Sequence, residues 1–222
     1  MMIENKEILK SFTGSAPVFA LPNFVMFPKT AYSFNIFESK YKEMVSDIVE
    51  TNKLFCVNLK KNNSESEFYN IGTLCYIIES KRLDNGNYTL IASGVSKVRI
   101  TNINKTKSYN VANLDLIQDN DTVTQEVLKR KKLINKFLSL VGNSNENINL
   151  NIIDTSMIST EMLTNLGSLI LPLENKDKQK LLELNNIELR LEVLCQFLDS
   201  ELKVESDLIN FNQIIPTNIN WN

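Results

Sequence analysis

The chain has 222 residues, enough to bury a sizeable core as one large domain or two small ones. Hydrophobic residues make up 43% and charged residues 23%, as in an ordinary globular protein, and the formal net charge of −2 argues against a broad phosphate-binding surface. No segment approaches the roughly 18 apolar residues of a membrane-spanning helix. The polar, acid-bearing N-terminus does not resemble a signal peptide, so we expect a cytoplasmic location.

The sequence contains no histidine, which excludes several kinds of chemistry. Ser-His-Asp catalysis, Cys-His catalysis and the usual zinc sites all need this residue. Cys56, Cys75 and Cys195 lie far apart in apolar segments and form no C-x-x-C motif. A nucleophile or a metal ligand is one interpretation, but we favour buried thiols that pack as small hydrophobic side chains. The sequence therefore predicts no catalytic residue, no metal site and no cofactor.

The first half of the chain has the pattern of a strand-rich domain. Asn85 and Gly86 lie between two apolar segments and predict a type I′ hairpin turn, because this dipeptide readily adopts positive φ angles. Gly94 is expected at a bend or bulge where two strands meet, and Gly72 is expected to do similar work. The polar stretch 60–70 predicts a loop. Strands are predicted at residues 18–21, 32–36, 54–59, 71–79, 88–92, 95–103 and 111–117, and a helix at 39–50.

The pattern changes at a polar link, residues 118–121, which separates strand-like from helix-like periodicity. Thr122 and Gln125 have the spacing of a capping box and predict the start of a helix that runs to Val141. The basic residues 129–132 on this helix are interpreted as a solvated face in preference to a phosphate contact. The residues expected to face the core are Val127, Ile134, Phe137, Leu138 and Val141.

Three more helices are predicted from their apolar periodicity, at residues 159–171, 176–184 and 187–202. The last of these is apolar on more than one face, so it is expected to pack centrally or against a partner. The predicted elements divide the chain into three parts: a β-rich lobe at 1–117, a helical lobe at 122–203 and a tail at 204–222.

The most specific motif reads PVFALPNFVMFP at residues 17–28 and continues as FNIFESKYKEM at residues 34–44. It resembles the start of the Lon N-terminal domain, whose pattern is approximately P-L-F-P-L-P-N-x-V-L-F-P followed by L-x-I-F-E-x-R-Y-x-x-M. Further segments of the chain resemble the same family in the same order, and the resemblance covers about residues 16–203. These segments are IGT at 71–73, the Asp84 to Tyr88 turn, the Gly94 to Ile100 strand and LPLENKDKQKLLE at 171–183.

The resemblance implies an α+β fold with a PUA-like, largely antiparallel β-barrel lobe followed by a C-terminal helical-bundle lobe. It also implies a non-catalytic module that binds unfolded or extended polypeptide, with a role in proteolysis or protein quality control and an ATP-dependent protease as a candidate partner. The sequence contains no G-x-x-x-x-G-K-[S/T] loop and no serine in a nucleophile setting, so no enzyme activity is expected. The oligomeric state is left open.

Five residues are candidates for peptide binding: Phe24, Met26, Phe27, Phe37 and Tyr41. Methionine and phenylalanine adapt to varied apolar partners, and the prolines around them stiffen the loop. Packing in the core is the alternative for each of them, because large apolar side chains are usually buried. RNA binding is the alternative function, since PUA-like barrels elsewhere bind RNA. The acidic balance and the lack of a basic and aromatic stripe argue against it.

Overall fold

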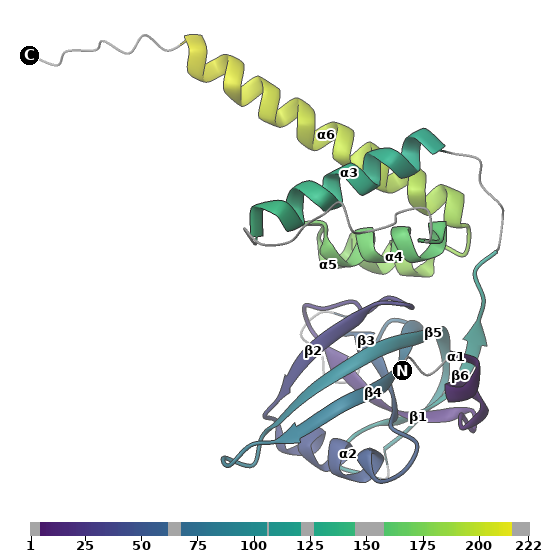
Figure 1. Cartoon of the computed structure of the whole chain (residues 1–222). Helices are drawn as coiled ribbons and strands as arrows, with labels where there is room; N and C mark the ends of the chain where they lie inside the picture. The colour runs from purple at the N-terminus through teal and green to yellow at the C-terminus, as the bar shows by residue number, and fades with distance from the viewer. Residues whose placement is uncertain (1–4, 62–67, 106, 121–126, 145–157, 215–222) are drawn as a thin grey trace, which may run out of the picture.

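The computed structural model describes residues 5–61, 68–105, 107–120, 127–144 and 158–214, with 5, 137–144 and 201–214 described as backbone only. Figure 1 shows a strand-rich lobe in purple to teal and a lobe of helices in green to yellow. This arrangement confirms the predicted α+β class, with a barrel lobe followed by a helical lobe. Among the described residues, no helix is long and apolar enough to cross a membrane.

The strands of the first lobe close into a barrel. In the described part of the chain their order is β2-β5-β4-β3-β1-β6, and β6 also pairs with β5. The pairs are antiparallel except for β1 with β3, so the expected, largely antiparallel barrel is confirmed. The strands are β1 (Ser15–Leu21), β2 (Ala31–Ile36), β3 (Leu54–Leu59), β4 (Ile71–Arg82), β5 (Tyr88–Asn104) and β6 (Val111–Ile117).

β5 is one continuous strand where the sequence predicted two. Its first half pairs with β2 and β4, and its second half pairs with β4 and β6. The predicted irregularity is present, because Cys75 lies opposite Gly94 while Leu74 lies opposite Ser96, which leaves Val95 as the extra residue of a bulge. The bulge bends β5 without ending it. The same strand therefore pairs with β2 in its first half and with β6 in its second half.

The hairpin between β4 and β5 is present, but the prediction of a type I′ turn is wrong. Gly86 has a φ of +76°, whereas Asn85 is not among the residues with positive φ. The amide of Gly86 donates to the Leu83 carbonyl at 2.9 Å, and the amide of Leu83 donates to the Asn87 carbonyl at 2.8 Å. This is the hydrogen-bond pattern of a longer hairpin loop, in which an ordinary turn is followed by one left-handed residue, Gly86. The loop therefore needs a positive φ at one residue, whereas a type I′ turn needs it at two.

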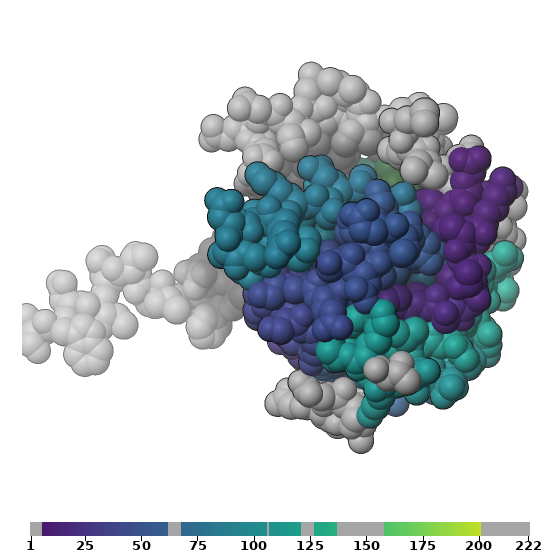
Figure 2. All heavy atoms as spheres, turned by 90° about the horizontal axis from the view of Figure 1, so that it is seen from below, coloured from purple at the N-terminus to yellow at the C-terminus, as the bar shows by residue number. Residues whose placement is uncertain are grey.

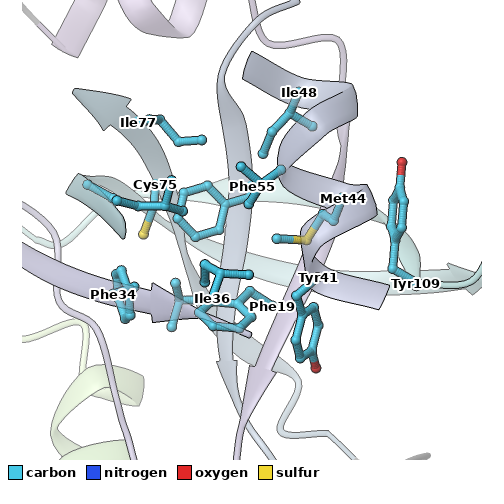
Figure 3. Packing of buried hydrophobic residues seen from close by; sticks show 14 of the residues in the cluster. Phe19, Phe34, Ile36, Tyr41, Met44, Ile48, Phe55, Cys75, Ile77 and Tyr109 are labelled. Carbon is cyan, nitrogen blue, oxygen red and sulfur yellow. The ribbon is translucent and has the colours of Figure 1, made fainter. Parts of the chain in front are cut away.

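The helix α2 (Ser39–Val49) covers one side of the strands. Its apolar face packs on the aromatic and aliphatic side chains of Figure 3, among them Phe19 and Phe55. The opposite faces of the same strands form a second core, to which the unpredicted helix α1 (Asn5–Lys10) contributes Ile8. The buried residues of α2 are Tyr41, Met44, Val45 and Ile48.

The three cysteines are buried thiols, as the favoured interpretation required. Cys75 belongs to the core under α2, Cys56 to the second core and Cys195 to the core of the helical lobe. Burial raises the pKa of the Cys56 thiol to about 12, so this thiol stays protonated and unreactive near neutral pH.

The second lobe consists of helices, as predicted, and its last helix runs past Leu202 into residues expected to be a tail. Ser159 caps α4, because its hydroxyl accepts a hydrogen bond from the Met162 amide at 3.1 Å. The predicted capping box at Thr122 and Gln125 lies outside the described residues. The helices are α3 (Val127–Ser144), α4 (Thr160–Ile170), α5 (Asn175–Glu183) and α6 (Ile187–Ile214).

Two expectations for α3 need correction. Val127 was expected to face the core but is 69% exposed, while Leu133 is fully buried beside Gly167. Ile134 is partly buried against the same core, and the side chains of Phe137, Leu138 and Val141 lie outside the described residues. Arg130 is not simply solvated, because its guanidinium reaches the Ile158 carbonyl at 2.7 Å and the start of α4.

The two lobes share one hydrophobic core. Val25, Phe27 and Leu59 of the barrel lobe pack among leucines of α3 to α6. A buried ionic cluster lies beside this shared core. It consists of Lys97 on β5, Asp119 after β6 and Arg190 on α6, which are 2%, 7% and 1% exposed.

Asp119 holds this cluster together. One of its carboxylate oxygens lies 2.5 Å from the Lys97 ammonium, and the other lies 2.6 Å from the Arg190 guanidinium. Lys97 also donates to the Leu184 carbonyl at 2.9 Å and to the Asn185 side chain at 3.1 Å. Burial lowers the pKa of Lys97, and the bond to Asp119 opposes that shift. One carboxylate thus balances two buried cations at the lobe junction.

We predict that Asp119→Asn lowers the free energy of unfolding by about 3 kcal/mol or more, because two buried cations lose their counter-charge. Lys97→Met should cost less, since Arg190 and Asp119 would remain as a one-to-one pair. Urea denaturation measures both. The control is Asp177→Asn, which breaks an exposed pair with Lys180 and should leave stability almost unchanged. An Asp119→Asn variant as stable as this control would contradict the prediction.

Candidate functional site

The loop at residues 22–28, which carries the most specific motif, is held by its carbonyl groups. The Met26 carbonyl accepts a hydrogen bond from the Thr73 hydroxyl at 2.6 Å, on β4. The Pro28 carbonyl accepts one from the Asn165 side chain at 3.0 Å, on α4. The loop is therefore fixed to the barrel on one side and to the helical lobe on the other.

Gly94 allows this loop to lie against β5. A Cβ atom at this position would lie 2.2 Å from the Phe27 carbonyl oxygen, which no side chain could accommodate. The Gly94 amide donates to the Thr30 carbonyl at 2.8 Å, and the Lys29 amide donates to the Gly94 carbonyl at 2.8 Å. Gly94 thus allows the backbone of the loop to lie close to the backbone of β5, and it also lies next to the bulge.

Three of the five candidate residues are buried in the described structure. Met26 is 1%, Phe27 is 0% and Tyr41 is 4% exposed, so these side chains do not reach the surface. Met26 and Tyr41 pack in the core under α2, while Phe27 packs in the core of the helical lobe. The Tyr41 hydroxyl donates to the Ala20 carbonyl at 3.0 Å. For these residues the structure supports the alternative of core packing.

The other two candidates retain exposed surface, and they lie at the two ends of β2. Phe37 follows the last residue of β2 and is 67% exposed. Phe24 is partly buried and stacks on Tyr32, with ring centroids 4.4 Å apart. Tyr32 is itself 44% exposed, and sequence reasoning missed it. The alternation of Tyr32, Phe34 and Ile36 puts all three on one face of the strand, so no signal in the sequence indicated that Tyr32 is exposed while Phe34 and Ile36 are buried.

β2 is an edge strand. Within the described residues it pairs with β5 alone, and its other side has no strand partner. Such an edge presents backbone N–H and C=O groups that a further strand can bind. The segment from Ala31 to Phe37 contains no charged residue. The structure therefore brings together an open strand edge and the aromatic rings of Phe24, Tyr32 and Phe37.

A polar cleft of about 550 Å³ lies beside the start of the same loop, between the lobes. Pro22 and Asn23 line its barrel side, together with Lys60 and Lys61. The residues at the start of α5, Glu174 to Lys176, line the other side. Among the described residues, no group of His, Cys, Asp and Glu side chains could hold a metal ion.

Comparison with known proteins identifies the family. The model for the ATP-dependent protease La (LON) substrate-binding domain matches residues 15–200, and the chain belongs to this family. The Lon protease of Buchnera aphidicola subsp. Acyrthosiphon pisum is 26% identical over 195 residues, covering 84% of this chain and 25% of that protein. The Lon protease of Dictyoglomus thermophilum is 24% identical over 196 residues, covering 85% of this chain and 24% of that protein. The chain thus spans about a quarter of the length of these relatives.

Solved structures show the same fold. A Lon N-terminal domain protein from Xanthomonas campestris aligns with a TM-score of 0.63 at 20% identity, covering 81% of this chain and 96% of that chain. The N-terminal domain of a Mycobacterium avium complex Lon protease aligns with a TM-score of 0.63 at 16% identity, covering 82% and 96%.

We predict that Gly94→Ala lowers the free energy of unfolding by about 3 kcal/mol or more, because the new methyl group meets the Phe27 backbone. Gly86→Ala is the matched control. Its Cβ would meet nothing within 4 Å, and its positive φ should cost only about 1–2 kcal/mol. Thermal and urea denaturation of both variants measure the difference. If Gly94→Ala is no more destabilising than Gly86→Ala, the loop does not depend on this contact.

Proposed function

We propose that this chain is a non-catalytic polypeptide-binding module in which an extended client segment adds to the free edge of β2. The open edge between Tyr32 and Phe37 is the observation that carries the proposal. A client strand would take its hydrogen bonds from the β2 backbone, which explains how one site could bind many sequences. The exposed rings at both ends would add apolar contacts to alternate client side chains.

The wider role that we propose is recognition of clients for an ATP-dependent protease, in proteolysis or protein quality control. Two observations support it. The family model is that of a protease substrate-binding domain, and the curated relatives are Lon proteases. In the part of the chain that the structure describes, we find no nucleotide-binding loop and no activated nucleophile, so the module would contribute binding and its partner would supply the chemistry.

Because the β2 edge is uncharged, peptide binding there should differ from RNA binding in its dependence on salt. Apolar and backbone contacts should depend little on salt, whereas phosphate contacts weaken steeply as salt rises. The client would also be bound weakly, because ordering a flexible segment offsets much of the contact energy.

The test is fluorescence anisotropy with a labelled peptide from a denatured protein and with a single-stranded RNA, each at low and moderate salt. We predict salt-insensitive peptide binding that weakens roughly tenfold in Tyr32→Asp, Phe37→Asp, because a carboxylate at each end removes apolar contact. Both positions are exposed, so the variant should remain folded. Circular dichroism checks this.

Leu116→Asp is the matched control, since Leu116 is 45% exposed on β6, away from the β2 edge. It should bind peptide like the unaltered protein. Equal binding by the double variant would show that the client binds elsewhere. Salt-sensitive RNA binding without peptide binding would overturn the proposed function itself.

A further inference from the structure

A pocket of about 260 Å³ opens where α2 meets the strands β1 and β3 and the segment between β5 and β6. In Figure 2 the blue α2 segment borders the teal segment that leads into β6. The floor of the pocket is apolar and comprises Val18, Ala20 and Phe68, which also belong to the second core of the barrel.

The rim of the pocket is basic. Lys40, Lys60, Lys105 and Lys107 all line it, although the chain as a whole carries a net charge of −2. These residues come from three separate parts of the fold, namely α2, the end of β3 and the segment between β5 and β6, so no basic run in the sequence predicted them. The positive charge is therefore gathered here by the fold.

Two of the four lysines already face carboxylates. Lys107 donates to Asp47 at 2.6 Å and to the Tyr109 hydroxyl at 2.8 Å, and these bonds raise its pKa. Lys40 lies 3.6 Å from Glu38. Among the described residues, no carboxylate lies within ion-pair distance of Lys60 or Lys105. With respect to the described part of the chain, the ammonium groups of Lys60 and Lys105 are thus available to an outside anion.

We propose that this pocket binds a carboxylate group of the client polypeptide. The inference rests on the proposed function and adds a preference for clients that carry a carboxylate. Lys60 supports the link to a polypeptide, because it lines both this pocket and the cleft beside Pro22. A bound chain could therefore pass from the cleft to the pocket along one surface.

A single carboxylate fits this pocket better than a nucleic acid does. Carboxylates on α2 interrupt the basic surface, since Asp47 binds Lys107 and Glu43 binds the Ser108 hydroxyl at 2.8 Å. Single-stranded nucleic acids need a continuous basic groove and exposed aromatic rings on which bases stack. The rings at this pocket, Tyr41 and Tyr109, are each 4% exposed.

The experiment compares peptides of one apolar sequence that carry either glutamate or glutamine at a central position and either a free or an amidated C-terminus. Anisotropy is measured with the unaltered protein and with Lys60→Gln, Lys105→Gln. We expect the carboxylate-bearing peptides to bind more tightly than the neutral one. The double variant should lose that preference, roughly 3- to 10-fold in affinity, while binding the neutral peptide unchanged. Comparing the two carboxylate positions shows whether a side chain or the chain terminus is preferred.

Lys81→Gln, Lys131→Gln is the control, because it removes the same charge at exposed lysines that line neither cavity. It should keep the preference. If all four peptides bind the unaltered protein equally well, the pocket inference is wrong and the proposed function stands. Absence of all peptide binding would overturn both. A Lys60- and Lys105-dependent affinity for single-stranded RNA, without a preference among peptides, would reassign the pocket to phosphate.

Discussion

The fold depends on a three-residue segment, Val25 to Phe27, whose side chains alternate between two cores. Met26 packs under α2 in the barrel lobe, while Val25 and Phe27 pack among the leucines of the helical lobe. This alternation requires the backbone to lie between the lobes, where its polar groups are removed from water. The Met26 carbonyl is satisfied by Thr73 and the Pro28 carbonyl by Asn165, so the burial leaves both acceptors bonded. The proline-framed motif thus fixes the barrel lobe to the helical lobe.

A series of polar contacts also connects the two lobes across their interface. Asn165 donates to the Pro28 carbonyl and accepts a hydrogen bond from Arg190 at 2.6 Å. Arg190 binds Asp119, which also binds Lys97 on β5. Because these charged groups are nearly inaccessible to water, separating the lobes would expose both an apolar surface and a satisfied ionic cluster. The two lobes should therefore behave as one body, and client binding should not require that they move apart.

Sequence periodicity predicted most strands and helices, because alternation and helical spacing are local properties. It could not assign Met26 and Phe27 to the interior, since an apolar loop residue looks the same whether it meets a client or a neighbouring lobe. The free edge of β2 follows from the pairing of β2 with the distant strand β5, which no local pattern contains. The basic pocket likewise depends on the barrel bringing Lys60 and Lys105 to one rim. Phe37 was chosen as a peptide-binding candidate because of its position in the motif, and no local pattern predicted its exposure.

The proline-framed loop is structural, and we propose that the edge of β2 is the surface that binds the client. Amide hydrogen exchange with and without a denatured-protein peptide tests it most directly. We predict that the amides of β2 that point away from β5 exchange more slowly when peptide is bound, because a client strand would hydrogen-bond to that edge. The amides of residues 25–27, which are buried, should not change. Slower exchange at residues 25–27 with no change along β2 would contradict the account.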